Sequence, residues 1–103
     1  MTITVDKKQP ALTLTLSGRL DTNTAPELEK TIAVECGGVT SLEIDMEKLE
    51  YISSAGLRVL LAAKKQMDKV SGTLTIYNVC DDIMEVLDMT GFSDILTINK
   101  KTA

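Results

Sequence analysis

Apolar and polar residues alternate with period two in several short segments of the chain. The clearest segment is 11–16, where leucines alternate with threonines, which predicts a strand with one buried face. A shorter alternation at 3–5 precedes it across a polar turn at 7–10. These two segments are predicted to pair as an antiparallel hairpin. Further strands are predicted at 42–46, 73–77 and 95–98.

Three other segments repeat their apolar residues at helical spacing. The first begins at Thr24, which with Glu27 fits a capping box, and it stops at a pair of glycines. The second runs from the Ser53-Ser54 pair to about Val70, and the third runs from residue 81 to residue 90. Their predicted buried residues are Ala25, Leu28, Ile32 and Cys36 in the first helix, Leu57, Leu60, Leu61, the stem of Lys64 and Met67 in the second, and Ile83, Val86, Leu87 and Thr90 in the third.

The predicted order of elements is β-β-α-β-α-β-α-β, with residues 46–51 as a connecting loop and 99–103 as a polar tail. This order favours a single α/β domain over residues 1–103. The opening hairpin is antiparallel, and helical crossovers make the later strands parallel. Because the strands alternate instead of being apolar throughout, we expect a mixed sheet with about three helices packed mainly on one face.

Composition excludes several function classes. The chain has 15 acidic and 11 basic residues, a net charge of −4, and no histidine. It therefore has no Ser-His-Asp machinery and no imidazole metal site, and its acidity argues against a nucleic-acid surface. Cys36 and Cys80 lie far apart and are expected to be free, buried thiols. No segment resembles a leader or a membrane span, so we expect a cytoplasmic protein without cofactor or metal.

The segment 45–57 carries the most specific chemistry. Two hydroxyl residues, Ser53 and Ser54, stand where a loop enters a helix, and the small residues Ala55 and Gly56 leave their approach open. Unpaired N–H groups and the helix dipole favour an anion at such a point. A phosphoserine, with a charge of about −1.5 to −2, is one such anion. Serine is also a preferred N-cap, so the residues themselves leave both interpretations open. A nucleophilic serine is not indicated, because there is no GxSxG elbow and Leu57 stands where SxxK needs a lysine.

The same segment resembles the phosphorylation-site motif of the anti-sigma-factor antagonists, which are bacterial members of the STAS domain family. In that family Asp-Ser-Ser/Thr-Gly-Leu opens a helix. Residues 17–21 with 24–25 resemble the family's Gly-x-Leu-Asp turn and first-helix entry, and residues 86–92 resemble its closing helix and glycine stop. The three matches occur in the family's order and span nearly the whole chain.

Carried over onto this sequence, the resemblance makes Ser54 the phospho-acceptor. Ser53 stands where the family has aspartate and is a competing acceptor, and Ala55 stands where the family has Ser or Thr. Asp21 matches the aspartate of the nearby loop and is expected to contact a partner. The expected partner-binding residues are Asp21, Ser53, Ala55, Gly56, Met84 and Met89.

The resemblance implies a partner switch. The unphosphorylated protein, a monomer when free, binds an ATP-dependent serine/threonine kinase that is also the anti-sigma factor, and so releases a sigma factor. Phosphorylation of Ser54 separates the complex, and a serine phosphatase resets it. The chain itself is expected to be non-enzymatic.

Two alternatives remain. The chain could be a STAS scaffold or binding module that is never phosphorylated, with Ser54 only an N-cap. A phospho-aspartate domain of the response-regulator kind, using Asp45 or Asp21 with Mg²⁺, has a related α/β plan. It lacks an acidic cluster after the first strand and a lysine after Tyr77.

Overall fold

The strands of a five-stranded sheet follow one another in space in the same order as along the chain, β1-β2-β3-β4-β5. The computed structural model describes residues 1–100. β1 is antiparallel to β2, and β2 to β5 are mutually parallel, as the sequence predicted. The strands are β1 (Thr2–Lys8), β2 (Ala11–Leu20), β3 (Ser41–Ile52), β4 (Thr73–Val79) and β5 (Thr97–Lys100).

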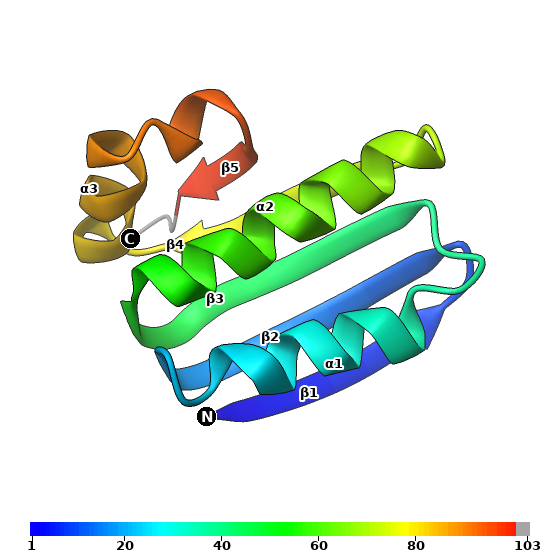
Figure 1. The fold of residues 1–103 in the computed structure, drawn as a ribbon, viewed down its shortest axis with the longest axis horizontal. Helices are drawn as coiled ribbons and strands as arrows, with labels where there is room; N and C mark the ends of the chain where they lie inside the picture. Colours follow the sequence, from blue (N-terminus) through cyan, green and yellow to red (C-terminus); the bar gives the residue numbers. More distant parts are fainter. Residues whose placement is uncertain (101–103) are drawn as a thin grey trace.

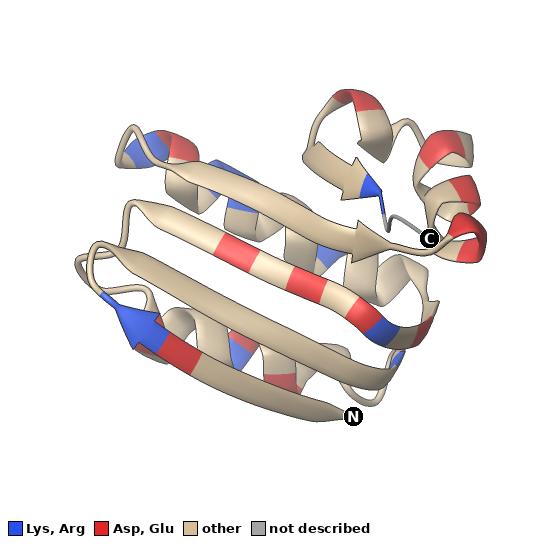
Figure 2. Ribbon diagram, turned by 180° about the vertical axis from the view of Figure 1, so that it is seen from behind, with Lys and Arg blue, Asp and Glu red and all other residues tan. Residues whose placement is uncertain are grey.

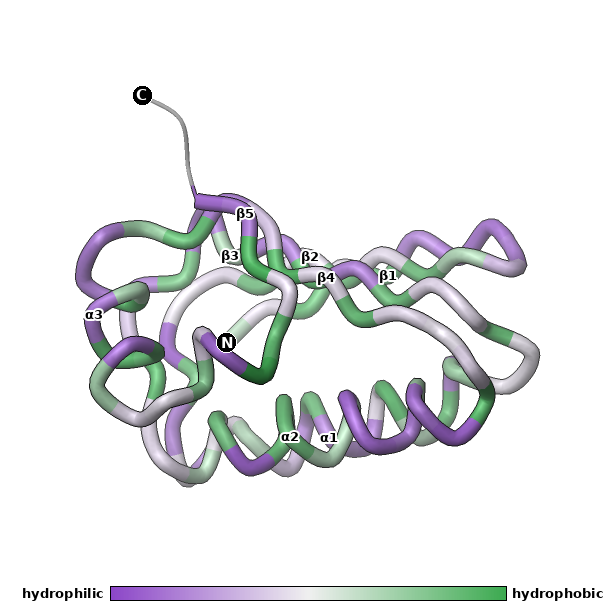
Figure 3. The backbone as a smooth tube through the Cα atoms, turned by 90° about the horizontal axis from the view of Figure 1, so that it is seen from above, coloured by the Kyte–Doolittle hydropathy of each residue, from purple (hydrophilic) through white to green (hydrophobic). Residues whose placement is uncertain are grey.

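Three α-helices and a short 3₁₀-helix connect the parallel strands (Figure 1). Since right-handed crossovers between strands added in one direction place every connection on the same side, the helices gather on one face. Figure 3 shows α1 and α2 beneath that face, with α3 beside one end of the sheet. This arrangement confirms the predicted fold class. The helices are α1 (Ala25–Glu35), α2 (Ser54–Lys69), α3 (Asp81–Met89) and the 3₁₀-helix η1 (Phe92–Asp94).

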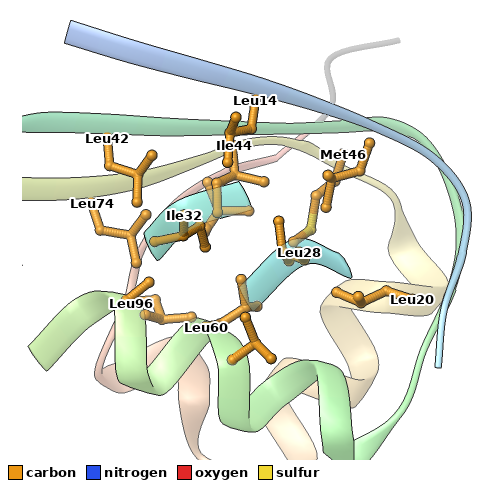
Figure 4. Close-up of a cluster of buried hydrophobic side chains, with 14 of the residues drawn as sticks. Leu14, Leu20, Leu28, Ile32, Leu42, Ile44, Met46, Leu60, Leu74 and Leu96 are labelled. Carbon is orange, nitrogen blue, oxygen red and sulfur yellow. The ribbon is translucent and has the colours of Figure 1, made fainter. Parts of the chain in front are cut away.

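The core lies between the sheet and the helices. Leu12, Leu14 and Leu16 of β2 are fully buried, while the threonines between them lie on the uncovered face. Figure 4 shows side chains from both layers meeting in this core, and Figure 2 shows acidic residues along β3 on the uncovered face. The labelled core side chains are Leu14, Leu20, Leu28, Ile32, Leu42, Ile44, Met46, Leu60, Leu74 and Leu96.

The predicted helix stripes are confirmed for α1 and partly wrong for the other helices. In α2, Lys64 is half-buried, in line with the predicted burial of its stem, whereas Leu61 is half-buried instead of buried, and Val59 and Ala63 are buried in addition. In α3 only two of the four expected residues are buried; Val86 is half-buried and Thr90 is exposed. The periodicity located each buried stripe, but it did not show how deeply packing buries the residues at the edges of the stripe.

The prediction of a loop at 46–51 is wrong, because β3 continues through this segment to Ile52. Register shifts in the pairing with β2, between Thr15 and Ser17 and between Gly18 and Arg19, interrupt the regular alternation. Buried positions in the second half of β3 are therefore three residues apart, at Leu49 and Ile52. A spacing of three between buried residues is not typical of a strand, so the hydrophobic pattern did not indicate that the strand continues here. β2 also extends to Leu20, beyond the predicted end.

The C-terminal strand begins two residues later than predicted. β5 starts at Thr97, and the preceding chain forms the 3₁₀ turn η1. Leu96 is buried, whereas Ile95, the predicted first residue of the strand, is 47% exposed. The left-handed backbone of Gly91 (φ +80°) ends α3 and redirects the chain into this turn. Residues 101–103 of the predicted polar tail lie outside the described residues.

Both cysteines are free thiols, as expected. Cys36 is buried at the end of α1, and this burial raises the pKa of its thiol. Cys80 is only half-buried, immediately before α3. Across residues 1–100, no helix is long and apolar enough to cross a membrane.

We expect Gly72→Ala to lower the free energy of unfolding by about 1–3 kcal/mol, the usual cost of overpacking. A Cβ at residue 72 would lie 2.6 Å from the backbone oxygen of Thr40, which cannot move without disturbing its hydrogen bond from Thr73 N. Gly37→Ala is the matched control, because a Cβ there meets nothing within 4 Å. Urea denaturation measures both variants, and equal stabilities would contradict this packing argument.

Candidate functional site

The carboxyl ends of β2 and β3 meet at one end of the sheet. Leu20 and Ile52 are the last paired residues of the two strands, and both are buried. The backbone N–H of Ser53 then donates to the carbonyl oxygen of Leu20 at 2.9 Å. This bond holds the loop that follows β2 beside the start of α2, so Asp21 and the serine pair belong to one surface (Figure 1).

The loop after β2 is organised by the side chain of Asp21. Its Oδ1 accepts from the backbone N–H groups of Asn23, at 3.0 Å, and Thr24, at 3.1 Å. The Thr24 hydroxyl accepts from Asp21 N at 2.8 Å and donates to Arg19 O at 2.7 Å. Thr24 thus binds the loop and makes no side-chain cap to α1, so the predicted capping box is wrong.

These contacts also set the ionisation of Asp21. Burial alone would raise the pKa of this carboxyl. The N–H groups of Thr24 and Asn23, the Thr24 hydroxyl and the Arg19 guanidinium outweigh burial and hold the pKa below its ordinary value of 3.8. Asp21 is therefore an anion at neutral pH, held in a fixed position beside the start of α2.

Ser53, not Ser54, is the N-cap of α2. Ser53 has extended backbone (φ −101°, ψ 173°), and its Oγ accepts from Gly56 N at 3.4 Å. Ser54 is the first helical residue and is exposed, and within residues 1–100 its side chain makes no hydrogen bond. The prediction that Ser54 could be the N-cap is wrong, because Ser53 has that role; the scaffold alternative does not depend on the cap and is tested below.

The two small residues after the serines serve different purposes. Gly56 is buried, and a Cβ on it would lie 2.7 Å from Leu20 Cγ and 3.1 Å from Ile52 Cγ1. The missing side chain lets α2 approach the ends of β2 and β3, so Gly56 shapes the site through packing and through its N–H. Ala55 is half-buried beside Ser54 and contributes little bulk to the surface.

Two arginines that were not among the predicted site residues, Arg19 and Arg58, flank this region. Arg19 and Tyr51 are paired across β2 and β3, with the guanidinium carbon 4.2 Å from the ring centroid. Arg58 follows Ser54 by one helical turn, a spacing that is visible in the sequence. The Arg19–Tyr51 contact could not be found there, because it depends on the shifted register of β2 and β3.

The two methionines predicted to bind a partner lie on α3, at the same end of the sheet as the start of α2 (Figure 1). Met84 is half-buried and packs against the core. Met89 is 79% exposed in the last turn of the helix. The structure thus leaves Met89 open to a partner and gives Met84 a largely structural environment.

The two carboxylates of the phospho-aspartate alternative, Asp45 and Asp21, do not form a cluster. Asp45 lies on the uncovered face of the sheet, where Oδ1 accepts from Asn78 Nδ2 at 3.1 Å and from Glu47 N at 3.0 Å. Asp21 lies in the loop after β2. No three His, Cys, Asp or Glu side chains among residues 1–100 are grouped so that they could hold a metal ion.

Comparison with known proteins matches residues 2–103 to the STAS domain. BtrV of Bordetella bronchiseptica, which bears the name of an anti-sigma factor antagonist, is 34% identical over 95% of this chain and 85% of its own. The anti-sigma-B factor antagonist of Bacillus subtilis strain 168 is 29% identical over 99% of this chain and 95% of its own.

The fold is also that of SpoIIAA, an anti-sigma factor antagonist from Bacillus. Its unphosphorylated form superposes with a TM-score of 0.76 at 17% identity, covering 99% of this chain and 90% of SpoIIAA. Its phosphorylated form superposes with a TM-score of 0.75 at 18% identity, covering 94% of this chain and 90% of SpoIIAA. With the family match over nearly the whole length and a relative above 30% identity, this chain belongs to the STAS domain family.

Proposed function

We propose that this STAS domain is an anti-sigma factor antagonist controlled by phosphorylation of Ser54. Without phosphate it binds an ATP-dependent anti-sigma serine/threonine kinase, which frees a sigma factor. Phosphorylation by that kinase ends the complex, and a serine phosphatase restores it. The names of the relatives support the first part of this proposal, and the geometry around Ser54 supports the second.

One observation carries the choice of Ser54 as acceptor. Its hydroxyl is exposed and, within residues 1–100, unengaged, while the neighbouring Ser53 Oγ is half-buried and accepts the Gly56 N–H. A kinase can approach Ser54 without breaking the cap of α2. Phosphorylation of Ser53 would remove that cap, whose loss typically costs about 1 kcal/mol. Ser53 is therefore the disfavoured acceptor of the two.

The reaction belongs to the kinase, and this chain supplies only the hydroxyl. Ser54 Oγ attacks the γ-phosphorus of ATP, the bond from that phosphorus to the β,γ-bridging oxygen breaks, and ADP leaves. The hydroxyl proton passes to a base of the kinase or to water. The product is a phosphoserine with about −1.5 to −2 charge at neutral pH.

The new charge acts on the partner rather than on the fold. Phosphoserine at the first helical position is compatible with the helix dipole, so α2 does not need to unfold. The dianion lies on the same surface as ionised Asp21 and half-buried Ala55, and Met89 is exposed at the same end of the sheet, while buried Gly56 contributes through packing. A partner that buries this region must then desolvate or repel a phosphate, which weakens the complex.

The remaining features of the proposal follow from the same partner switch. The chain has no catalytic activity of its own and needs no cofactor. It is monomeric when free and works in the cytoplasm. It does not contact nucleic acid, since its effect on transcription passes through the kinase and the sigma factor. Met84, which is half-buried against the core, contributes to the partner surface through its exposed part, together with the exposed Met89.

Incubation with the anti-sigma kinase of the same organism and Mg·ATP is expected to add one phosphate to the wild-type chain and to Ser53→Ala. Ser54→Ala is expected to remain unmodified, because it lacks the acceptor oxygen. Intact-mass spectrometry with peptide mapping measures this. An unmodified wild-type chain would overturn the switch and leave the scaffold alternative, and phosphate mapped to Ser53 would overturn the choice of acceptor.

Binding to the same kinase is expected to weaken at least about tenfold in Ser54→Asp, since a charge buried against the partner costs at least about 1.4 kcal/mol. Ser54→Ala is expected to bind like wild type and to remain bound when ATP is added. Calorimetric titration measures these affinities. Equal affinities for the two variants would contradict the role of charge at this position.

Asp21→Asn is expected to weaken kinase binding about tenfold, because it removes the fixed anion beside α2 while keeping the shape of the side chain. Asp68→Asn is the matched control, since Asp68 is exposed near the far end of α2 and pairs with Lys64. Thermal unfolding of both variants shows whether the loop around Asp21 stays intact. Equal kinase affinities for the two variants would remove Asp21 from the interface.

A further inference from the structure

Arg58 lies on α2 four residues after Ser54, one helical turn along the same face. Helical side chains lean toward the N-terminus, so the first turn of α2 is within the reach of a side chain as long as that of Arg58. Arg58 is exposed, and within residues 1–100 it forms no ion pair. The chain has only one other arginine, Arg19, which is already engaged with Asp21 and Tyr51.

A surface hollow lies between the first turns of α1 and α2. Thr22, Ala55 and Arg58 line it, and its volume is about 210 Å³. Since a water molecule occupies about 30 Å³ of liquid, the hollow has room for a phosphate group and several waters. Ala55, which follows Ser54 directly in the chain, lines the hollow with only a methyl group.

One carboxylate, Glu29 of α1, also lines this hollow. It lies beyond ion-pair distance of Arg58, since the ion pairs among residues 1–100 are those of Arg19 with Asp21 and of Lys64 with Asp68. Glu29 therefore leaves the guanidinium available. A phosphate carries up to twice the charge of a carboxylate and can accept two parallel guanidinium hydrogen bonds, so it is the stronger partner for Arg58.

We propose that Arg58 is the intramolecular partner of the phosphate on Ser54 and holds that group beside the hollow between α1 and α2. This inference rests on the proposed function, because it concerns the phosphorylated state of the same serine. The phosphate is then partly neutralised and fixed in direction by its own chain. In the phosphorylated chain, a partner contacts an oriented phosphate–arginine pair. In the unphosphorylated chain, it contacts the serine hydroxyl at the same place.

The test uses the full chain with phosphoserine inserted at position 54 during synthesis, so no kinase is needed. A nearby cation favours the dianion, which lowers the second pKa of the phosphate from its usual value of about 6. Arg58→Gln is expected to raise this pKa by about 0.3 pH units, the shift equivalent to a typical i, i+4 ion pair. Phosphorus NMR over a pH titration measures it.

Lys65→Gln is the matched control. Lys65 is an exposed cation on the same helix, 11 residues from Ser54, or about 16 Å along the helix axis, which exceeds the screening length at physiological salt. It is expected to leave the phosphate pKa unchanged. Equal phosphate pKa values in the Arg58→Gln and Lys65→Gln proteins would overturn the proposal. Because the kinase takes no part, this result is independent of whether the kinase modifies Ser54.

Discussion

The parallel pairing of β2 with β3 at their carboxyl ends is the constraint on which the site depends. Leu20 and Ile52 are paired there, and the hydrogen bond from Ser53 N to Leu20 O continues the pairing just past the end of β3. Gly56 then lets α2 pack directly on those two side chains. Without this contact the Asp21 loop and the serine pair, which are more than 30 residues apart in the chain, would have no fixed relation.

At this site, some residues stabilise the fold and their neighbours remain available for recognition by a partner. Ser53 caps α2, which leaves the exposed hydroxyl of Ser54 unused by the fold. Thr24 organises the loop with its hydroxyl, which leaves one oxygen of Asp21 facing Arg19 at 3.9 Å. A surface of this kind can gain or lose a phosphate at little cost to stability, because the groups that hold it together are not the groups that are modified.

Charge is distributed unevenly over the molecule. α3 carries Asp81, Asp82, Glu85 and Asp88 without a basic residue, whereas both arginines lie close to the start of α2 or to the strand ends beside it. The net charge of −4 therefore says little about the neighbourhood of Ser54. Electrostatics at the proposed switch depend on a few local groups, chiefly Asp21, Arg19 and Arg58.

The amino-acid pattern alone determined the element order, the opening hairpin and the position of the serine pair, because leucine alternation and glycine stops are local signals. Only the tertiary structure decided that residues 46–51 are strand, since shifted pairing with β2 replaces alternation there. It likewise decided which serine is the cap and that Arg19 stacks on Tyr51. These outcomes follow from the pairing of β2 with β3, which extends to the bond from Ser53 N to Leu20 O, and no local pattern encodes contacts between segments so distant in the chain.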